Sequence, residues 1–227
     1  MKNVQASLSL KPNSKPIFLK ARTLPFSIRS TVEQEIDCMV NSGILTKVNH
    51  SAWATPVVPV IKSFGRVRLC GDYKVTVNKH LNIDEHPLPI IDELFANMAG
   101  GQKFSKLDLA QAYLQMEVRP EDREILTLNT HLGLYQPSRL MYGVASALAI
   151  FQREITQVLG NIPGVSVFLD DIKVTGSDDE THLRRLEMVL QRLDKYGMRV
   201  NVSKCEFFAD RDEAGHGRIR TSKFSLA

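Results

Sequence analysis

Residues 165–174 read Val-Ser-Val-Phe-Leu-Asp-Asp-Ile-Lys-Val, an apolar, β-rich run that two adjacent aspartates, Asp170 and Asp171, interrupt. Asp is depleted in β-strands, and a buried carboxylate without a partner is costly. The run therefore predicts a tight β-hairpin with both carboxylates at its tip, because Asp is favoured in turns. Two interpretations stay open: a plain turn, or a turn that presents carboxylates to a metal ion at the edge of a sheet.

A third aspartate, Asp108, follows the strand-like segment 104–107 and has no turn residue beside it. A purely structural explanation is that Asp108 caps a nearby helix or pairs with Lys106. The alternative is a metal site shared with Asp170 and Asp171, since carboxylates on two strand ends suit two Mg²⁺ ions about 3.5–4 Å apart. Mg²⁺ prefers oxygen ligands and usually takes few carboxylates together with substrate phosphates.

Four segments have the apolar spacing of helices. They cover Ser30 to Gly43 and residues 90–98, 148–159 and 181–196. Ser30 and Glu33 form a capping box that predicts the start of the first helix, and Gly43 predicts its end. The inward face of the last helix is predicted to consist of Leu183, Leu186, Leu190 and Leu193.

Strands are expected at 57–61 and 67–70 as a hairpin, near 104–109, within 165–174, and once more around 200–202. Hairpins favour antiparallel pairing. The pattern therefore predicts an α+β fold in which an antiparallel sheet carries helices on one face.

Composition narrows the class of protein. The 227 residues are 43% hydrophobic and 24% charged, which is enough to build a core. No apolar run approaches the roughly 20 residues of a membrane span, and residues 1–20 lack the apolar segment of a secretory signal. The three cysteines lie far apart without a C-x-x-C spacing, so neither a disulfide framework nor a zinc site is expected. An intracellular protein with no membrane contact, not a secreted one, fits these features.

The first 32 residues contain six basic residues and no acidic one, within a net charge of +4. Pro12, Pro16 and Pro25 favour an extended arm over a packed element. The charge either attracts phosphate backbones through counterion release or only solubilises a loose tail.

Three motifs then carry a resemblance: Leu-Asp-Leu-Ala-Gln-Ala-Tyr at 107–113, Arg-Leu-Met-Tyr-Gly-Val-Ala-Ser at 139–146 and Phe-Leu-Asp-Asp at 168–171. In this order they resemble the reverse transcriptases of LTR retrotransposons, in particular Ty3/gypsy-like elements. Supporting segments are 53–58, 68–74 with Asn78, 151–153 and 204–207.

The resemblance implies the fingers and palm of a right-hand polymerase: an α+β fold with an antiparallel palm sheet packed on helices and no thumb. The implied division is a basic, Pro-containing arm at 1–29, fingers at 30–83 and 116–146, palm at 84–115 and 147–208, and a divergent tail at 209–227.

The resemblance also assigns roles by position. Asp108, Asp170 and Asp171 match the catalytic aspartates that bind Mg²⁺ or Mn²⁺, and Leu109 would add its backbone carbonyl as a metal ligand. The residues that match dNTP-binding positions are Lys62, Arg68, Tyr113, Tyr142, Gly143 and Lys204. Gln152 and Phe168 match positions near the template and primer.

Four of these assignments have a plainer alternative. Lys62 and Arg68 would grip a triphosphate, a task that suits an ammonium and a bidentate guanidinium, but charges on a hairpin also confer solubility. Tyr113 would crowd a ribose 2′-hydroxyl, although an ordinary core aromatic explains it equally. Lys204 would lie near the leaving phosphate, or is a plain surface lysine.

The chain also departs from the family pattern. Met141-Tyr142 and Ala147-Leu148 stand where the family has Pro-Phe and Ala-Pro, and losing both prolines loosens the pocket loop and the helix start. Phe168 replaces a tyrosine. These changes are expected to reduce the activity but not to abolish it. After Phe208 only Gly215-His216 of the family's next segment remains, which makes firm holding of a duplex doubtful without a thumb.

The function that follows from the resemblance is RNA-directed DNA polymerisation: two-metal nucleotidyl transfer from a dNTP to a primer 3′-hydroxyl, on an RNA or DNA template, in the cytoplasm or nucleus. Two alternatives stay open. One is a polymerase-derived module that binds nucleic acid without turnover, and the other is a fragment of a decayed element. The sequence leaves the oligomeric state undetermined.

Overall fold

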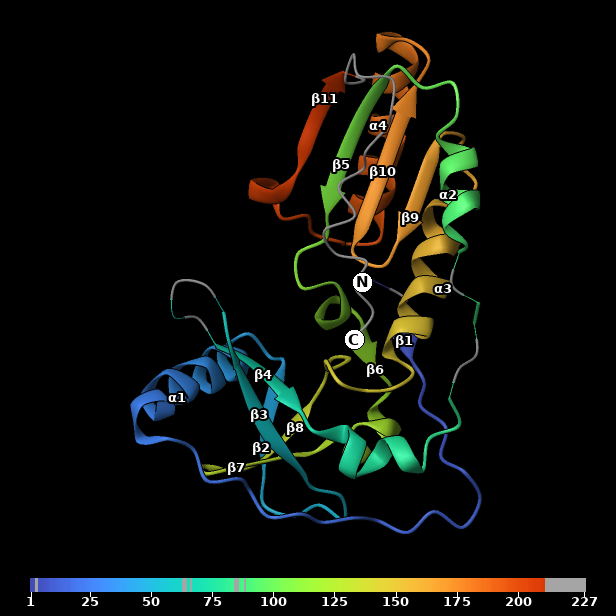
Figure 1. Cartoon of the computed structure of the whole chain (residues 1–227). Helices are drawn as coiled ribbons and strands as arrows, with labels where there is room; N and C mark the ends of the chain where they lie inside the picture. Colours follow the sequence, from blue (N-terminus) through green and yellow to red (C-terminus); the bar gives the residue numbers. More distant parts are fainter. Residues whose placement is uncertain (3, 63–64, 66, 84–85, 88, 211–227) are drawn as a thin grey trace.

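The computed structural model describes residues 1–210 except 3, 63–64, 66, 84–85 and 88 (Figure 1). Within this part the chain forms a four-stranded sheet, a five-stranded sheet and a short two-stranded pair. Most of the tail predicted at 209–227 lies outside the described residues.

The four-stranded sheet has the order β11-β5-β10-β9 and is antiparallel throughout. Its strands are β5 (Lys103–Asp108), β9 (Val165–Phe168), β10 (Asp171–Gly176) and β11 (Glu206–Asp210). The β9–β10 hairpin confirms the prediction for residues 165–174. Leu107, Ile172 and Val174 are fully buried, so one face of this sheet forms part of the core.

Three helices pack on this sheet: α2 (Ile91–Asn97), α3 (Ala147–Leu159) and α4 (Asp179–Lys195). Helix α4 packs on β10 and β5, whereas α2 and α3 contact β9 (Figure 1). The sequence therefore predicted both ends of these three helices to within two residues.

The inward face predicted for α4 is partly wrong. Leu183 and Leu190 are 52% and 41% exposed, and the helix instead buries His182, Leu186, Val189 and Leu193. The reason is that α4 is rotated toward its histidine. The His182 ring lies 2.8 Å from Ser105 Oγ and packs edge-on against Phe208.

The five-stranded sheet has the order β2-β8-β7-β3-β4. Its strands are β2 (Leu45–Val48), β3 (Thr55–Ile61), β4 (Val67–Gly71), β7 (Leu128–Thr130) and β8 (Gly133–Pro137). Strands β3 and β4 form the predicted hairpin, and only the β3–β7 pairing is parallel. Helix α1 (Phe26–Asn41) packs against β4 and β2.

The capping box predicted for α1 is wrong. The helix begins at Phe26, directly after Pro25, and Ser30 therefore lies inside it. Pro25 is the N-cap residue, and its carbonyl accepts from Ile28 N–H at 3.2 Å, so the helix begins five residues before the start that a cap at Ser30 predicts. The predicted end is confirmed, because Gly43 adopts φ +71° and Ile44 N–H donates to Met39 O at 2.8 Å.

The remaining described elements are short. They are β1 (Gln5–Ala6), β6 (Glu117–Val118) and the 3₁₀ turns η2 (Tyr73–Val75), η3 (Val77–Lys79), η4 (Ala112–Gln115), η5 (Pro120–Asp122), η6 (Glu124–Leu126) and η7 (Val202–Lys204). The strand predicted at 200–202 is wrong, because Val200 makes only an isolated bridge to Leu109 and Val202 begins η7.

The N-terminal arm is packed, contrary to the expectation of a loose extended segment. Strand β1 pairs in parallel with β6, and the side chains of Met1, Ala6 and Leu8 are buried. Farther along, Leu19 N–H donates to Ala54 O at 3.0 Å, beside the five-stranded sheet. Apolar residues near the start of the arm thus outweigh its prolines.

The structure also describes the cysteines and the lengths of the helices. Cys38, Cys70 and Cys205 are all free thiols. Within the described residues, every helix is too short or too polar to cross a bilayer.

Helix α4 provides a prediction about stability and pH. The Asp178 carboxylate accepts hydrogen bonds from the N–H and hydroxyl of Thr181, at 2.8 and 2.9 Å, and from Ser177. The Thr181 N–H is the largest cause that lowers the Asp178 pKa from 3.8 to about 2. This contribution to stability is therefore complete above pH 4 and is lost as pH falls through about 2.

We expect Asp178→Ala to lower the thermal midpoint at neutral pH and to approach wild type as pH falls toward 2. Asp178→Asn is the matched control, because Asn also caps helices but does not titrate. Melting curves followed by circular dichroism across pH 2–7 measure both. A deficit in Asp178→Ala that is constant down to the lowest pH would contradict the assignment.

Candidate active site

The three aspartates meet at one end of the four-stranded sheet. Asp108 ends β5 and Asp171 begins β10, and the antiparallel register places them directly opposite each other. Asp170 lies in the turn before β10, and its carbonyl accepts a hydrogen bond from Leu109 N–H at 2.8 Å. The turn also requires Leu169 to adopt the left-handed conformation, with φ +57°.

Two of the carboxylates have lysine partners. Asp108 has a 5% exposed side chain, and both of its oxygens lie 3.3 Å from Lys204 Nζ. Asp171 Oδ1 lies 3.4 Å from Lys106 Nζ and forms an ion pair with it, but this oxygen accepts no hydrogen bond. The proposed pairing of Asp108 with Lys106 is therefore wrong. A carboxylate that loses contact with water needs a nearby cation. Asp108 pairs with Lys204, and its sequence neighbour Lys106 pairs with Asp171.

The donor set suits a hard cation. Burial raises the pKa of the Tyr142 phenol, and the charges of Asp170 and Asp108 raise it further, whereas the charge of Arg68 lowers it. Leu109, whose carbonyl was a predicted ligand, follows Asp108 and is 2% exposed. Within the described residues, no three Asp, Glu, His or Cys side chains come close enough to form a ready-made metal cluster. Mg²⁺ and Mn²⁺ fit such a site because they complete their shell with phosphate oxygens and water.

A cavity of about 400 Å³ is lined by Lys62, Arg68 and Tyr142, together with the carboxylate of Glu35. The Arg68 guanidinium stacks 4.3 Å from the centre of the Tyr142 ring. Burial lowers the pKa of Lys62, and the neighbouring charges of Arg68 and Lys204 lower it further. Two cations, Lys62 and Arg68, thus line this cavity against one carboxylate, Glu35, and this net positive charge suits an anionic ligand.

Tyr113 lies between this cavity and the core. Its ring packs edge-on against Tyr142 at 5.4 Å and Phe151 at 5.5 Å. Burial, followed by the charge of Asp170, raises the pKa of Tyr113 to about 12, so the phenol is neutral at physiological pH.

The loop that carries Tyr142 is held by contacts that the sequence did not reveal. Gly143 has φ +97°, and a Cβ there would lie 2.6 Å from Gly71 O, so only glycine fits. The Asn78 side chain donates to Gly143 O and accepts from Ala145 N–H, both at 2.9 Å. These bonds fix the loop where the family's prolines are missing.

Sequence reasoning also missed Gln111, which lines the same cavity and has φ +50°. Its place inside the 107–113 motif is the only sequence signal that singles it out. A left-handed backbone at a non-glycine residue gives no pattern in the sequence.

The assignment of Gln152 to the template or primer is corrected by its burial, which is complete. Its Oε1 accepts from Leu169 N–H at 2.8 Å, and its Nε2 donates to Val167 O at 3.0 Å and Thr156 Oγ1 at 3.1 Å. Gln152 therefore braces the hairpin that carries Asp170. Phe168 lies half-buried opposite Asp171, and its role stays a prediction.

Comparison with known proteins identifies the class. Residues 65–220 match the family of reverse transcriptases (RNA-dependent DNA polymerases). The chain therefore belongs to the reverse transcriptase family, as its motifs predicted.

The relatives are polyproteins of mobile elements and one uncharacterized protein. The chain is 30% identical over 209 residues to the transposon Tf2-3 polyprotein of Schizosaccharomyces pombe, covering 91% of this chain and 16% of that protein. It is 31% identical over 198 residues to the Pol polyprotein from transposon opus of Drosophila melanogaster, covering 85% and 20%. It is 32% identical over 205 residues to the uncharacterized protein K02A2.6 of Caenorhabditis elegans, covering 89% and 16%. The chain thus spans a fifth or less of these proteins.

Solved structures show the same fold. The foamy viral protease-reverse transcriptase in complex with double-stranded DNA superposes with a TM-score of 0.81 at 25% identity, covering 87% of this chain and 35% of that one. The native prototype foamy virus enzyme gives a TM-score of 0.77 at 28% identity, covering 86% and 26%. The predicted α+β reverse transcriptase fold is confirmed.

The brace formed by Gln152 gives a prediction. Gln152→Met keeps the volume but leaves Leu169 N–H and Val167 O without their partners, at a cost of about 1–3 kcal/mol for each buried group. We expect the free energy of unfolding, measured with urea, to fall by about 2 kcal/mol or more. Thr156→Val is the control, because it removes only the contact within α3. Equal losses in both variants would show that the hairpin contacts carry no special weight.

Proposed function

We propose that this chain is the fingers and palm of an RNA-directed DNA polymerase. The observation that supports it is the meeting of Asp108, Asp170 and Asp171 at one sheet end, in a fold that also has a cavity lined by Lys62 and Arg68. The four-stranded sheet would form the palm. The five strands of the other sheet all lie within 30–83 and 116–146, the ranges assigned to the fingers.

The proposed reaction is nucleotidyl transfer. The primer 3′-oxygen attacks the α-phosphorus of a dNTP, its bond to phosphorus forms while the α–β bridging bond breaks, and pyrophosphate leaves with the electron pair. Mg²⁺ or Mn²⁺, held by the aspartates and the Leu109 carbonyl, supplies charge stabilisation for the attacking and leaving oxygens when bound. The protein needs no nucleophile of its own, because positioning and electrostatics carry the catalysis.

The cations have complementary tasks in this proposal. Lys62 and Arg68 hold the triphosphate, and the Tyr142-Gly143 loop forms the wall beside it. Lys204 is proposed to meet the leaving phosphate, and its ion pair with Asp108 supports a place near the reacting centre. The Lys204 side chain is 56% exposed. In this proposal its ammonium shifts from the Asp108 carboxylate to the phosphate.

The proposed partners are a dNTP and an RNA or DNA template with its primer. Support comes from relatives, since the foamy viral enzyme has been solved with double-stranded DNA and with an RNA/DNA hybrid. Phe168, half-buried beside Asp171, is proposed to contact the primer or template. An intracellular location, cytoplasmic or nuclear, fits such substrates.

A second candidate is a module that binds primer–template without turnover. One observation favours it: in the described residues Asp108 and Asp171 pair with lysines, and no three Asp, Glu, His or Cys side chains form a ready-made metal cluster. Binding of this kind depends on phosphate contacts and weakens steeply with salt.

Primer extension on an RNA template with Mg²⁺ or Mn²⁺ separates the two functions. We expect extension by the wild type and a loss on the order of 10³-fold in Asp108→Asn and in Asp170→Asn, because the charge at the reacting centre is removed. Asp194→Asn, on the exposed side of α4, is the control. Extension that survives both site substitutions would refute the proposed chemistry. Salt-sensitive binding without any extension by the wild type would establish the second candidate.

Tyr113 gives a test of substrate choice. We expect Tyr113→Ala to reduce the preference for dNTP over rNTP, measured as the ratio of kcat/KM values, by about 10-fold or more, because the ring no longer crowds a 2′-hydroxyl. Tyr113→Phe should keep the preference, since the ring and not the hydroxyl does the excluding. An unchanged ratio in Tyr113→Ala would reassign the residue to core packing.

A further inference from the structure

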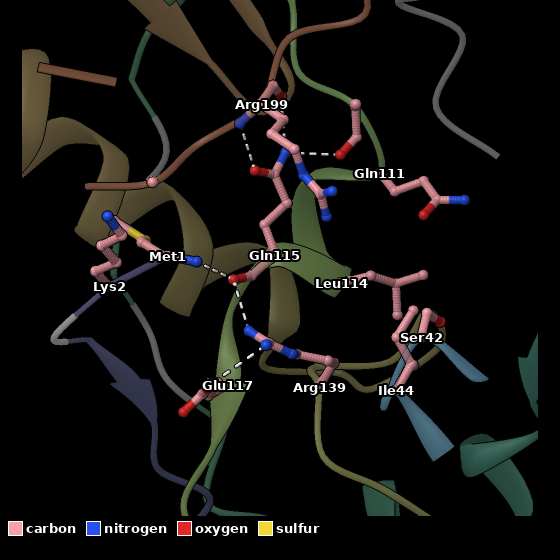
Figure 2. Close-up of a pocket in the computed structure, with 12 residues that line it drawn as sticks. Met1, Lys2, Ser42, Ile44, Gln111, Leu114, Gln115, Glu117, Arg139 and Arg199 are labelled. Carbon is pink, nitrogen blue, oxygen red and sulfur yellow. Dashed lines mark hydrogen bonds and ion pairs between the residues drawn. The ribbon is translucent and has the colours of Figure 1, made fainter. Parts of the chain in front are cut away.

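A second cavity, of about 410 Å³, is lined by Gln111, Leu114 and Gln115 of the η4 region, among others (Figure 2). Gln111 and Leu114 line both this cavity and the one that Lys62 and Arg68 line. The two cavities are therefore neighbours that share one short segment of wall. No role assigned above uses the second cavity.

Its charge is strongly uneven. Lys2, Arg139 and Arg199 line it, against one carboxylate, Glu117. Glu117 is already paired with Arg139 at 3.2 Å. Within the described part of the chain, the side chains of Lys2 and Arg199 have no carboxylate within ion-pairing distance. The cavity therefore has a surplus of positive charge that suits an anion.

The two arginines are held in place by one buried residue, Gln115, which is 5% exposed. Its side-chain Nε2 donates to Arg199 O at 2.9 Å, and its Oε1 accepts from Arg199 N–H at 2.7 Å. Its backbone carbonyl accepts from Arg139 Nη1 at 3.3 Å. Figure 2 shows Gln115 between the two guanidinium groups. An exposed arginine whose backbone is fixed on both sides loses less entropy when it binds a ligand.

We propose that this cavity binds a polyphosphate anion: inorganic pyrophosphate or the phosphate tail of a nucleoside triphosphate. Two guanidinium groups and an ammonium match several phosphate oxygens, and guanidinium is suited to bidentate contacts with phosphate. The volume exceeds what a single phosphate needs. The description of this cavity as a neighbour of a dNTP pocket rests on the proposed function. The positive charges of the cavity and the hydrogen bonds of Gln115 do not depend on that function.

Calorimetric titration without metal, in EDTA, tests binding independently of turnover. Pyrophosphate and ATP are titrated into a Lys62→Gln/Arg68→Gln background, which removes the cations of the neighbouring pocket. We expect binding of both, and a loss of about 10-fold or more in affinity when Arg199→Gln is added, because charge-assisted bonds are lost. Arg184→Gln, an exposed arginine on α4, should leave the affinity unchanged, and Arg199→Lys should give an intermediate value.

The arms of the test distinguish the sources. Equal affinities for pyrophosphate and ATP indicate that phosphates alone are recognised, whereas tighter binding of ATP indicates a nucleotide. Unchanged affinity in Arg199→Gln, or an equal loss in Arg184→Gln, would overturn the proposal. The proposal would also be overturned if a single-stranded oligonucleotide bound more tightly than ATP and its binding depended on Arg199. The cavity would then be a contact for a nucleic-acid strand. Thermal midpoints confirm folding, and failure of primer extension would leave these binding results intact.

Discussion

The antiparallel register of β5 and β10 is the constraint on which the rest of the site depends. It sets Asp108 opposite Asp171, and a shift by one residue would turn every side chain of a strand to the other face. Two acids at one sheet end repel each other and lose hydration, so Lys204 and Lys106 must lie close by. The position of η7, which carries Lys204, is thus part of the same electrostatic arrangement as the strands.

Side-chain amides, two of them buried, provide the second layer of order. Gln152 holds the hairpin, Asn78 holds the Tyr142 loop, and Gln115 holds the backbone of Arg199. Each amide both donates and accepts, so it can satisfy an N–H and a C=O of an irregular segment at once. Loops without regular pairing are otherwise costly to bury. Rigid loops around the candidate site therefore come from polar contacts as well as from proline or glycine.

Much of this could be predicted from the sequence, and the failures have physical causes. The hairpin with Asp170 and the β3–β4 hairpin followed from local residue patterns, and the family followed from motifs in order. The burial of Gln152 could not, because its partners in the hairpin are set by tertiary packing. The rotation of α4 toward His182 was hidden for the same reason, since a histidine gives no apolar signal. The prediction of a loose N-terminal arm failed because its buried residues, Met1, Ala6 and Leu8, are too sparse to form a periodic pattern in the sequence.

The contact between the arm and the middle of the chain bears on how this protein is made. Leu8 N–H bonds to Asp122, 114 residues later, and β1 has no partner strand until β6 has been synthesised. Contacts between distant parts of a chain slow folding, because closing long loops costs entropy before any contact forms. The carboxylates likewise meet only when β5 and β10 pair. During synthesis the N-terminal arm therefore stays unpaired and the three aspartates stay apart until the later strands have been made. A ligand that binds the aspartates would stabilise only the fully folded chain.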